Sequence, residues 1–121
     1  MNDKIRELHD MIIGYLECAL WVDSEEGKEE IYTADNLAAE CYGKAGVDCF
    51  YFLDAATKRG INVGDYTMLG HDLWLTRNGH GSGFWDGDWQ ENDGEILTEL
   101  TGNMFKEVDL YVGDDGKIYF N

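Results

Sequence analysis

The spacing of apolar residues constrains the fold of this chain most, because it follows a helical period in the first half and changes in the second. Apolar side chains recur every three or four residues from Ile5 to Leu20, which predicts an amphipathic helix over about residues 3–22. The exposed face of this helix is polar and mostly acidic. The stretch that follows, residues 23–30, is predicted to be an acidic connector.

A second helical stretch is predicted beyond this connector. Thr33 or Asp35 is suited to cap it, since both side chains accept hydrogen bonds from free backbone N–H groups. Gly43 and Gly46 weaken the helix, so it either continues through them or breaks and restarts. A basic pair followed by Gly60 is typical of a helix end.

The second half of the chain shows a strand-like period. Residues 73–76 predict a short strand, and the Asn-Gly pair at 78–79 is typical of a hairpin turn. Residues 95–105 return to a helical spacing, with Asp93 or Asn92 as the predicted cap.

A final hairpin is predicted from residues 108–112 and 117–120, joined by a turn rich in glycine and aspartate. Val108, Leu110 and Val112 alternate onto one face of its first strand. The expected fold class is therefore α+β, with three to four helices packed on a small antiparallel β-sheet.

The length of 121 residues predicts a single domain over residues 1–121, large enough for one core. It divides into a helical half (1–60) and a half (68–121) that runs hairpin, helix, hairpin. The cysteines are odd in number and lack CxxC spacing, which indicates small buried thiols and a reducing compartment. They are Cys18, Cys41 and Cys49.

The net charge restricts the function. Twenty-five acidic and nine basic residues leave a formal charge of −16. Such a surface is repelled by nucleic acids and by anionic membranes, which argues against direct binding to either. It is attracted to a basic groove on a partner, although solubility alone also explains it. The N-terminus lacks the form of a signal peptide, and no apolar stretch reaches the length of a membrane span.

Residues 70–86 combine groups that packing alone does not require. Two histidines, two aspartates, two tryptophans and four glycines fall within seventeen positions. Two histidines with one or two carboxylates suit Zn²⁺. The alternative is a hydrogen-bonded polar cluster without a metal, and both remain open because the spacing matches no standard ligand motif. The candidate ligands are His71, His80, Asp86 and Asp72.

The geometry of this segment decides whether a metal can be bound. If residues 78–79 form a two-residue turn, His71 faces Asp86 across a hairpin and His80 lies ~20 Å away. A wide loop over residues 78–83 would instead bring His80 back toward the other two side chains. We favour the wide loop, since a simple turn does not explain three alternating glycines.

The chain resembles a family of small phage and prophage proteins in three segments: residues 70–86, 94–98 and 107–116. The recurring pattern of that family is a GHDFWLTRNGHGAGFWD run followed by a helix and an EVDLYVGDDG hairpin. Leu73 and Ser82 stand where the pattern has Phe and Ala. The resemblance implies a metal-containing anti-CRISPR protein, an inhibitor of a CRISPR effector nuclease in the cytoplasm of the infected bacterial host.

Such a protein is not an enzyme, and we expect a monomer that blocks nucleic-acid loading by binding a basic surface of the nuclease. Acidic side chains of the last helix and final hairpin are the expected contacts: Glu91, Asp93, Glu95, Glu99, Glu107, Asp109, Asp114 and Asp115. An accessory or structural phage protein ranks second. A small metal-dependent hydrolase using His71, His80 and Asp86 ranks third, because no other substrate-site chemistry is recognisable.

Overall fold

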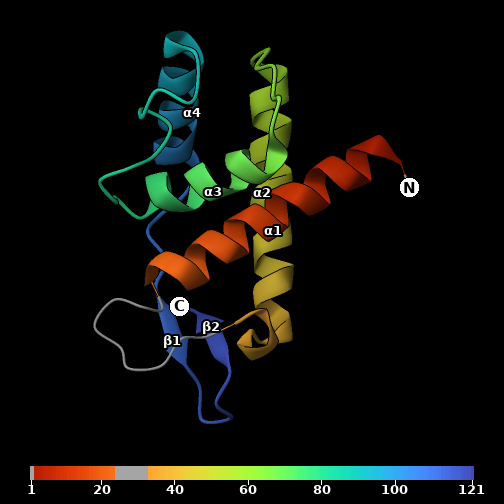
Figure 1. Ribbon diagram of the computed structural model, residues 1–121, viewed down its shortest axis with the longest axis vertical. Helices are drawn as coiled ribbons and strands as arrows, with labels where there is room; N and C mark the ends of the chain where they lie inside the picture. The colour runs from red at the N-terminus through yellow and green to blue at the C-terminus, as the bar shows by residue number, and fades with distance from the viewer. Residues whose placement is uncertain (1, 24–32) are drawn as a thin grey trace.

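The computed structural model describes residues 2–23 and 33–121, which form four α-helices, one short 3₁₀ helix and a two-stranded antiparallel sheet (Figure 1). The elements in chain order are α1 (Asp3–Asp23), η1 (Ala34–Asn36), α2 (Ala39–Lys58), α3 (Tyr66–Arg77), α4 (Glu91–Met104), β1 (Leu110–Val112) and β2 (Ile118–Phe120). The predicted α+β class is confirmed, with a sheet that is very small.

The first predicted helix is confirmed as α1. Asn2 caps it, since its side-chain oxygen accepts a hydrogen bond from the Lys4 backbone N–H at 2.8 Å. Most of the acidic connector predicted over residues 23–30 lies outside the described residues. Thr33 caps η1, with Asp35 inside that turn, so neither residue caps α2 as predicted.

The second helix, α2, continues without a break through Gly43 and Gly46. Its buried face packs into the core and outweighs the low helix propensity of the two glycines. The predicted end is confirmed at Gly60, whose φ of 79° lies in the left-handed region. The Ile61 N–H then donates to the Ala56 carbonyl, a bond typical of glycine-terminated helices.

The strand predicted over residues 73–76 is wrong, because these residues belong to α3. Asp65 begins this helix by accepting a hydrogen bond from the Met68 N–H at 3.0 Å. Leu73, Trp74 and Leu75 are consecutive and all buried, so the helix is covered on several sides. A helix buried this way shows little amphipathic period, and a short apolar run then resembles a strand.

The hairpin turn predicted at Asn78 and Gly79 is also wrong. Gly79 has a φ of 68° and ends α3, and the His80 N–H donates to the Leu75 carbonyl at 3.1 Å. The Gly79 N–H donates to Thr76 at 3.3 Å, which completes a Schellman motif. An Asn-Gly pair accepts positive φ equally well in a hairpin and at a helix end, so the sequence signal is ambiguous.

The helices α1 and α3 cross in close contact at two glycines (Figure 1). A Cβ added to Gly70 would lie 1.9 Å from the Met11 carbonyl oxygen, and one added to Gly14 would lie 2.0 Å from the Thr67 carbonyl oxygen. These helix backbones therefore touch directly, and only glycine fits at either position.

The last helix, α4, begins after Gln90 rather than at the predicted caps Asn92 and Asp93, which lie in its first turn. Gly94 lies inside the helix, where the Phe84 carbonyl oxygen approaches its backbone; an added Cβ would lie 2.6 Å from that atom. A side chain at this position would therefore push the helix away from the preceding loop.

The final hairpin is confirmed, with Tyr111 opposite Tyr119 in the antiparallel register. The face predicted to carry Val108, Leu110 and Val112 is half-buried at the first two residues and exposed at Val112. Ile118 and Phe120 of β2 are buried and join the core instead. One hydrophobic core contains residues from both halves of the chain.

Candidate functional site

The loop between α3 and α4 positions most of the residues predicted to form a site. Phe84 anchors it, since its ring is buried and stacks on Phe52 with centroids 5.7 Å apart. The Gly83 N–H donates to the Asp86 carboxylate at 2.9 Å, which closes a short turn. The Phe84 N–H donates to the Thr76 hydroxyl at 3.2 Å. The loop is thereby fixed against the end of α3.

One pocket of about 590 Å³ lies between this loop, α3 and the end of α1. We call it the histidine pocket; its polar lining includes His71, Asp72, His80, Asp86 and Asp88. As the wide-loop interpretation expects, the two histidines and both predicted aspartates surround one space. Trp21 of α1 closes one side, with its ring 6.5 Å from that of His71.

The predicted ligands do not converge on a common point. Among the described residues, no three His, Cys, Asp or Glu side chains are arranged to hold a metal ion. Asp72 accepts a hydrogen bond from the Trp89 indole N–H at 2.8 Å, and its other oxygen lies 3.9 Å from His71 Nδ1. Asp72 is thus hydrogen-bonded to Trp89, and among the described residues no third side chain joins it and His71 to complete a Zn²⁺ ligand set. Zinc binding stays a prediction.

Asp72 is one of two polar residues buried in the described part of the chain. Burial raises the pKa of its carboxyl above the usual range, and the nearby carboxylates of Asp88 and Asp86 raise it further. The hydrogen bond from Trp89 and the neighbouring His71 oppose this rise. The Trp89–Asp72 bond ties the loop to α3, and it offsets part of the cost of burying the Asp72 carboxylate.

Cys49 is fully buried, as predicted, and burial raises the pKa of its thiol. Such a thiol is a poor nucleophile because the thiolate is the reactive form. All three cysteines are free and buried, which confirms their predicted role as small core residues.

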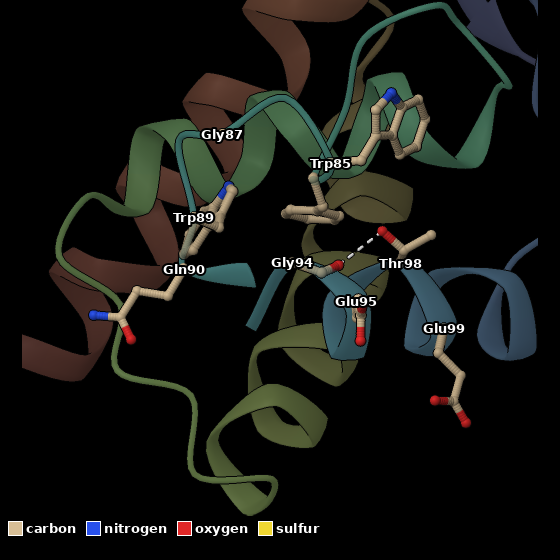
Figure 2. Close-up of a pocket in the computed structure, with 9 residues that line it drawn as sticks. Trp85, Gly87, Trp89, Gln90, Gly94, Glu95, Thr98 and Glu99 are labelled. Atoms are coloured by element: carbon tan, nitrogen blue, oxygen red, sulfur yellow. Dashed lines mark hydrogen bonds between the residues drawn. The ribbon is translucent and has the colours of Figure 1, made fainter. Parts of the chain in front are cut away.

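A second pocket, of about 600 Å³, lies between the loop and α4, and no local sequence pattern indicated it. We call it the aromatic pocket; Trp85 and Trp89 flank it, while Glu95 and Glu99 project from α4 (Figure 2). The Thr98 hydroxyl donates to the Gly94 carbonyl at 2.8 Å, inside the same helix. Trp85 is 50% exposed, a fraction that sequence alone does not reveal.

Arg77, at the end of α3, carries a side chain that is almost fully buried and has a structural role. It pairs with Asp48 of α2 at 2.7 Å and donates to the Tyr15 hydroxyl at 2.8 Å. It also donates twice to the Lys106 carbonyl and lies over the Phe105 ring at 4.8 Å. Its side chain is only 8% exposed, so it joins α1, α2 and the segment after α4.

The predicted partner contacts are spread along the molecule. The helix α4 lies at one end of the long axis and the hairpin at the other (Figure 1). Glu91 is the first residue of α4, and Asp93 is half-buried. The other predicted contacts have exposed side chains: Glu95, Glu99, Glu107, Asp109, Asp114 and Asp115. Asp115 accepts a hydrogen bond from the Tyr119 hydroxyl at 2.6 Å, which lowers the pKa of Asp115.

Comparisons of the chain with protein-family models, with curated proteins and with solved structures find no match. Within the described part of the chain, none of the helices has the length and apolarity needed to cross a membrane. The structure thus defines a small, acidic α+β domain with two surface pockets beside one fixed loop.

Proposed function

We propose that this chain is an acidic binding protein, without catalytic activity, that docks on a basic surface of a host protein. Following the family resemblance, the partner is a CRISPR effector nuclease, and docking blocks the surface on which that nuclease loads nucleic acid. The complex would form in the cytoplasm of the infected bacterial host.

The distribution of ion pairs carries this proposal. The Lys and Arg pairs of the described residues lie on α1, α2 and α3: Arg6–Asp3, Lys44–Glu40, Lys58–Asp54 and Arg77–Asp48. Among the described side chains, none of the ion pairs includes Asp93, Glu95 or Glu99 of α4 or a carboxylate of the hairpin. The exposed acids there are therefore available to a cationic partner, which they attract over long range.

The test is gel filtration of the purified chain with candidate effector nucleases that carry no nucleic acid. We expect a one-to-one complex at about 0.05 M salt that weakens at about 0.5 M, where the Debye length falls to roughly 4 Å. Absence of a complex with every nuclease would contradict the proposed function. Self-assembly of the chain, with no effect on host immunity, would favour an accessory phage protein instead.

A matched pair of variants tests the docking surface. Asp109→Lys/Asp114→Lys changes two exposed acids of the hairpin region, and Asp10→Lys/Glu17→Lys changes the charge equally on α1. We expect the first variant to weaken the complex at least about tenfold, and the second by less than about threefold. Equal weakening by both would mean that net charge, rather than this surface, drives association.

Zinc binding is tested separately, since docking does not depend on it. Elemental analysis of the wild type beside His71→Ala and His80→Ala variants answers this directly. One zinc per chain, lost in both variants, would support a structural zinc in the histidine pocket. Metal-free wild-type protein would end that prediction and leave the polar-cluster interpretation.

A further inference from the structure

The two-stranded sheet has one edge that the chain itself covers. In Figure 1, β2 lies between β1 and the start of α2, where the Ala38 N–H donates to the Ile118 carbonyl at 2.9 Å. On the same edge, the Lys44 ammonium donates to the Phe120 carbonyl at 3.3 Å. The outward carbonyls of β2 are therefore already bonded within the molecule.

The other edge belongs to β1, and the register shows which of its backbone groups face outward. The Gly113 N–H donates to the Lys117 carbonyl at 2.7 Å. Bonded and unbonded pairs alternate along an antiparallel ladder, so the N–H and C=O groups of Leu110 and Val112 point away from β2. No hydrogen bond is found for these four outward groups in the described part of the chain. They form an open edge on which another strand can pair.

The two faces of this open strand differ in chemistry, because successive side chains of a strand alternate. Leu110 and Val112 lie on the face that they share with the buried side chains of β2, and Val112 is 42% exposed. Asp109 and Tyr111 lie on the other face and are exposed, with the Tyr111 ring stacked on Tyr119. An added strand would meet apolar side chains on one face, and a carboxylate and an aromatic ring on the other.

The charge around the hairpin selects the kind of strand that fits. Residues 106–121 contain four acidic side chains and two lysines, and none of these acids joins an ion pair with a described side chain. A second copy of this chain would bring the same acids to the edge, where like charges repel. A basic strand is attracted instead, and its cations are also favoured beside the ring of Tyr111.

We propose that β1 pairs with an extended basic segment of the partner, which adds a third, antiparallel strand to the sheet. This proposal rests on the proposed function, and it adds the way in which the partner is held. Apolar side chains of the segment pack beside Leu110 and Val112, and alternate with lysines or arginines that lie beside Asp109 and Tyr111. Backbone hydrogen bonds then supply affinity, and the alternating side chains supply specificity.

The test uses eight-residue peptides in which valine alternates with arginine. In an antiparallel pair, the residues opposite Leu110 and Val112 exchange backbone hydrogen bonds with them, and these residues are the valines. One peptide is N-methylated at every valine, which removes the donors that face β1. The matched control is N-methylated at every arginine, where the N–H groups face solvent, so both peptides have the same composition and charge.

Titration is followed by the NMR shifts of the Leu110 and Val112 amides. We expect the arginine-methylated peptide to bind at least about fivefold more tightly than the valine-methylated one, since only the latter loses its hydrogen bonds to β1. A peptide with glutamate in place of arginine should bind at least about tenfold more weakly than the arginine-methylated peptide.

Variants of the chain locate the pairing. Val112→Pro removes an outward N–H and leaves the bonds between β1 and β2 in place, because proline is tolerated on edge strands. It should weaken binding of the arginine-methylated peptide about tenfold. Val112→Ala keeps the N–H and loses only side-chain contact, so it should weaken binding about two- to threefold. Circular dichroism and the NMR shifts of β2 would verify that both variants are folded.

Equal binding of the two methylated peptides, or equal weakening by Val112→Pro and Val112→Ala, would overturn the strand-pairing proposal. A dimer of the wild-type chain that Val112→Pro dissociates would also overturn it, because the edge would then belong to a second copy. The docking function would survive these results, since it is decided by the salt dependence of the nuclease complex. Absence of that complex, with retained N–H-dependent peptide binding, would contradict the docking function alone.

Discussion

Replacement of Gly70 by alanine should destabilise this protein severely, although alanine is the better helix former. The new Cβ would lie 1.9 Å from the Met11 carbonyl oxygen and 2.8 Å from the Tyr15 nitrogen. Both atoms belong to the backbone of α1, so no side chain can rotate away. The helices must separate to accommodate the methyl group.

The magnitude follows from the size of that separation. Real Cβ atoms do not approach other heavy atoms within 3.0 Å, so α1 and α3 must move apart by at least 3.0 − 1.9 = 1.1 Å. A gap of 0.5–1 Å already removes about a quarter to a half of the dispersion energy across an interface. Overpacking of this kind costs about 1–3 kcal/mol and occasionally more. Because it acts along a whole helix crossing, we expect a net loss of about 3–5 kcal/mol, after about 1 kcal/mol of gained helix propensity.

Urea unfolding followed by circular dichroism measures this change, with Gly43→Ala as the matched control. Gly43 lies in the middle of α2, and a Cβ there would meet no atom within 4 Å. Gly43→Ala should therefore raise the free energy of unfolding by about 0.5–1 kcal/mol. If Gly70→Ala were as stable as Gly43→Ala, the close crossing of α1 and α3 would be wrong.

Three further predictions concern charged groups. Arg77→Met should lower the free energy of unfolding by about 3 kcal/mol in urea titrations, because it leaves the Asp48 carboxylate without its ion-pair partner. A loss below about 1 kcal/mol would contradict this. The raised pKa of Asp72 means that the native state binds more protons than the unfolded state. The resulting loss of folding stability is absent below the ordinary pKa of 3.8 and grows as pH rises from there through the pKa of the native state. Asp72→Asn should therefore be more stable than wild type at neutral pH, with the difference vanishing near pH 3 in a series of unfolding titrations; a constant difference would refute it. Tyr119→Phe should raise the pKa of Asp115 toward its usual range in an NMR titration, since the Tyr119 hydroxyl is the main cause of its depression; an unchanged pKa would exclude that bond.

The sequence predicted those elements whose period and ends are encoded locally. The helix α1 shows a clear apolar stripe, so it was predicted, and the end of α2 was predicted from a basic pair followed by Gly60. The final hairpin was predicted from its alternation and its Gly-Asp turn. The helix α3 was missed, because its burial by neighbouring elements erased the amphipathic period.

The candidate site was predicted in composition but not in geometry. The sequence indicated that the histidines and aspartates of residues 70–86 belong together, and they do surround one pocket. It could not indicate that Asp72 is committed to Trp89, a residue seventeen positions further on. The aromatic pocket had no local signal, because its rings and carboxylates come from a loop and a helix that meet only in the fold.

By itself, the sequence determined the acidic surface, the helical first half and the final hairpin, since charge and periodicity are properties of the chain alone. Only the tertiary structure explains why residues 14 and 70 are Gly14 and Gly70. The backbone of the facing helix lies directly against each of them, and that contact does not exist in the sequence alone. The tertiary structure likewise decided that Asn78 and Gly79 end a helix, since the same left-handed backbone serves a hairpin and a helix end, and only the burial of α3 selects between them.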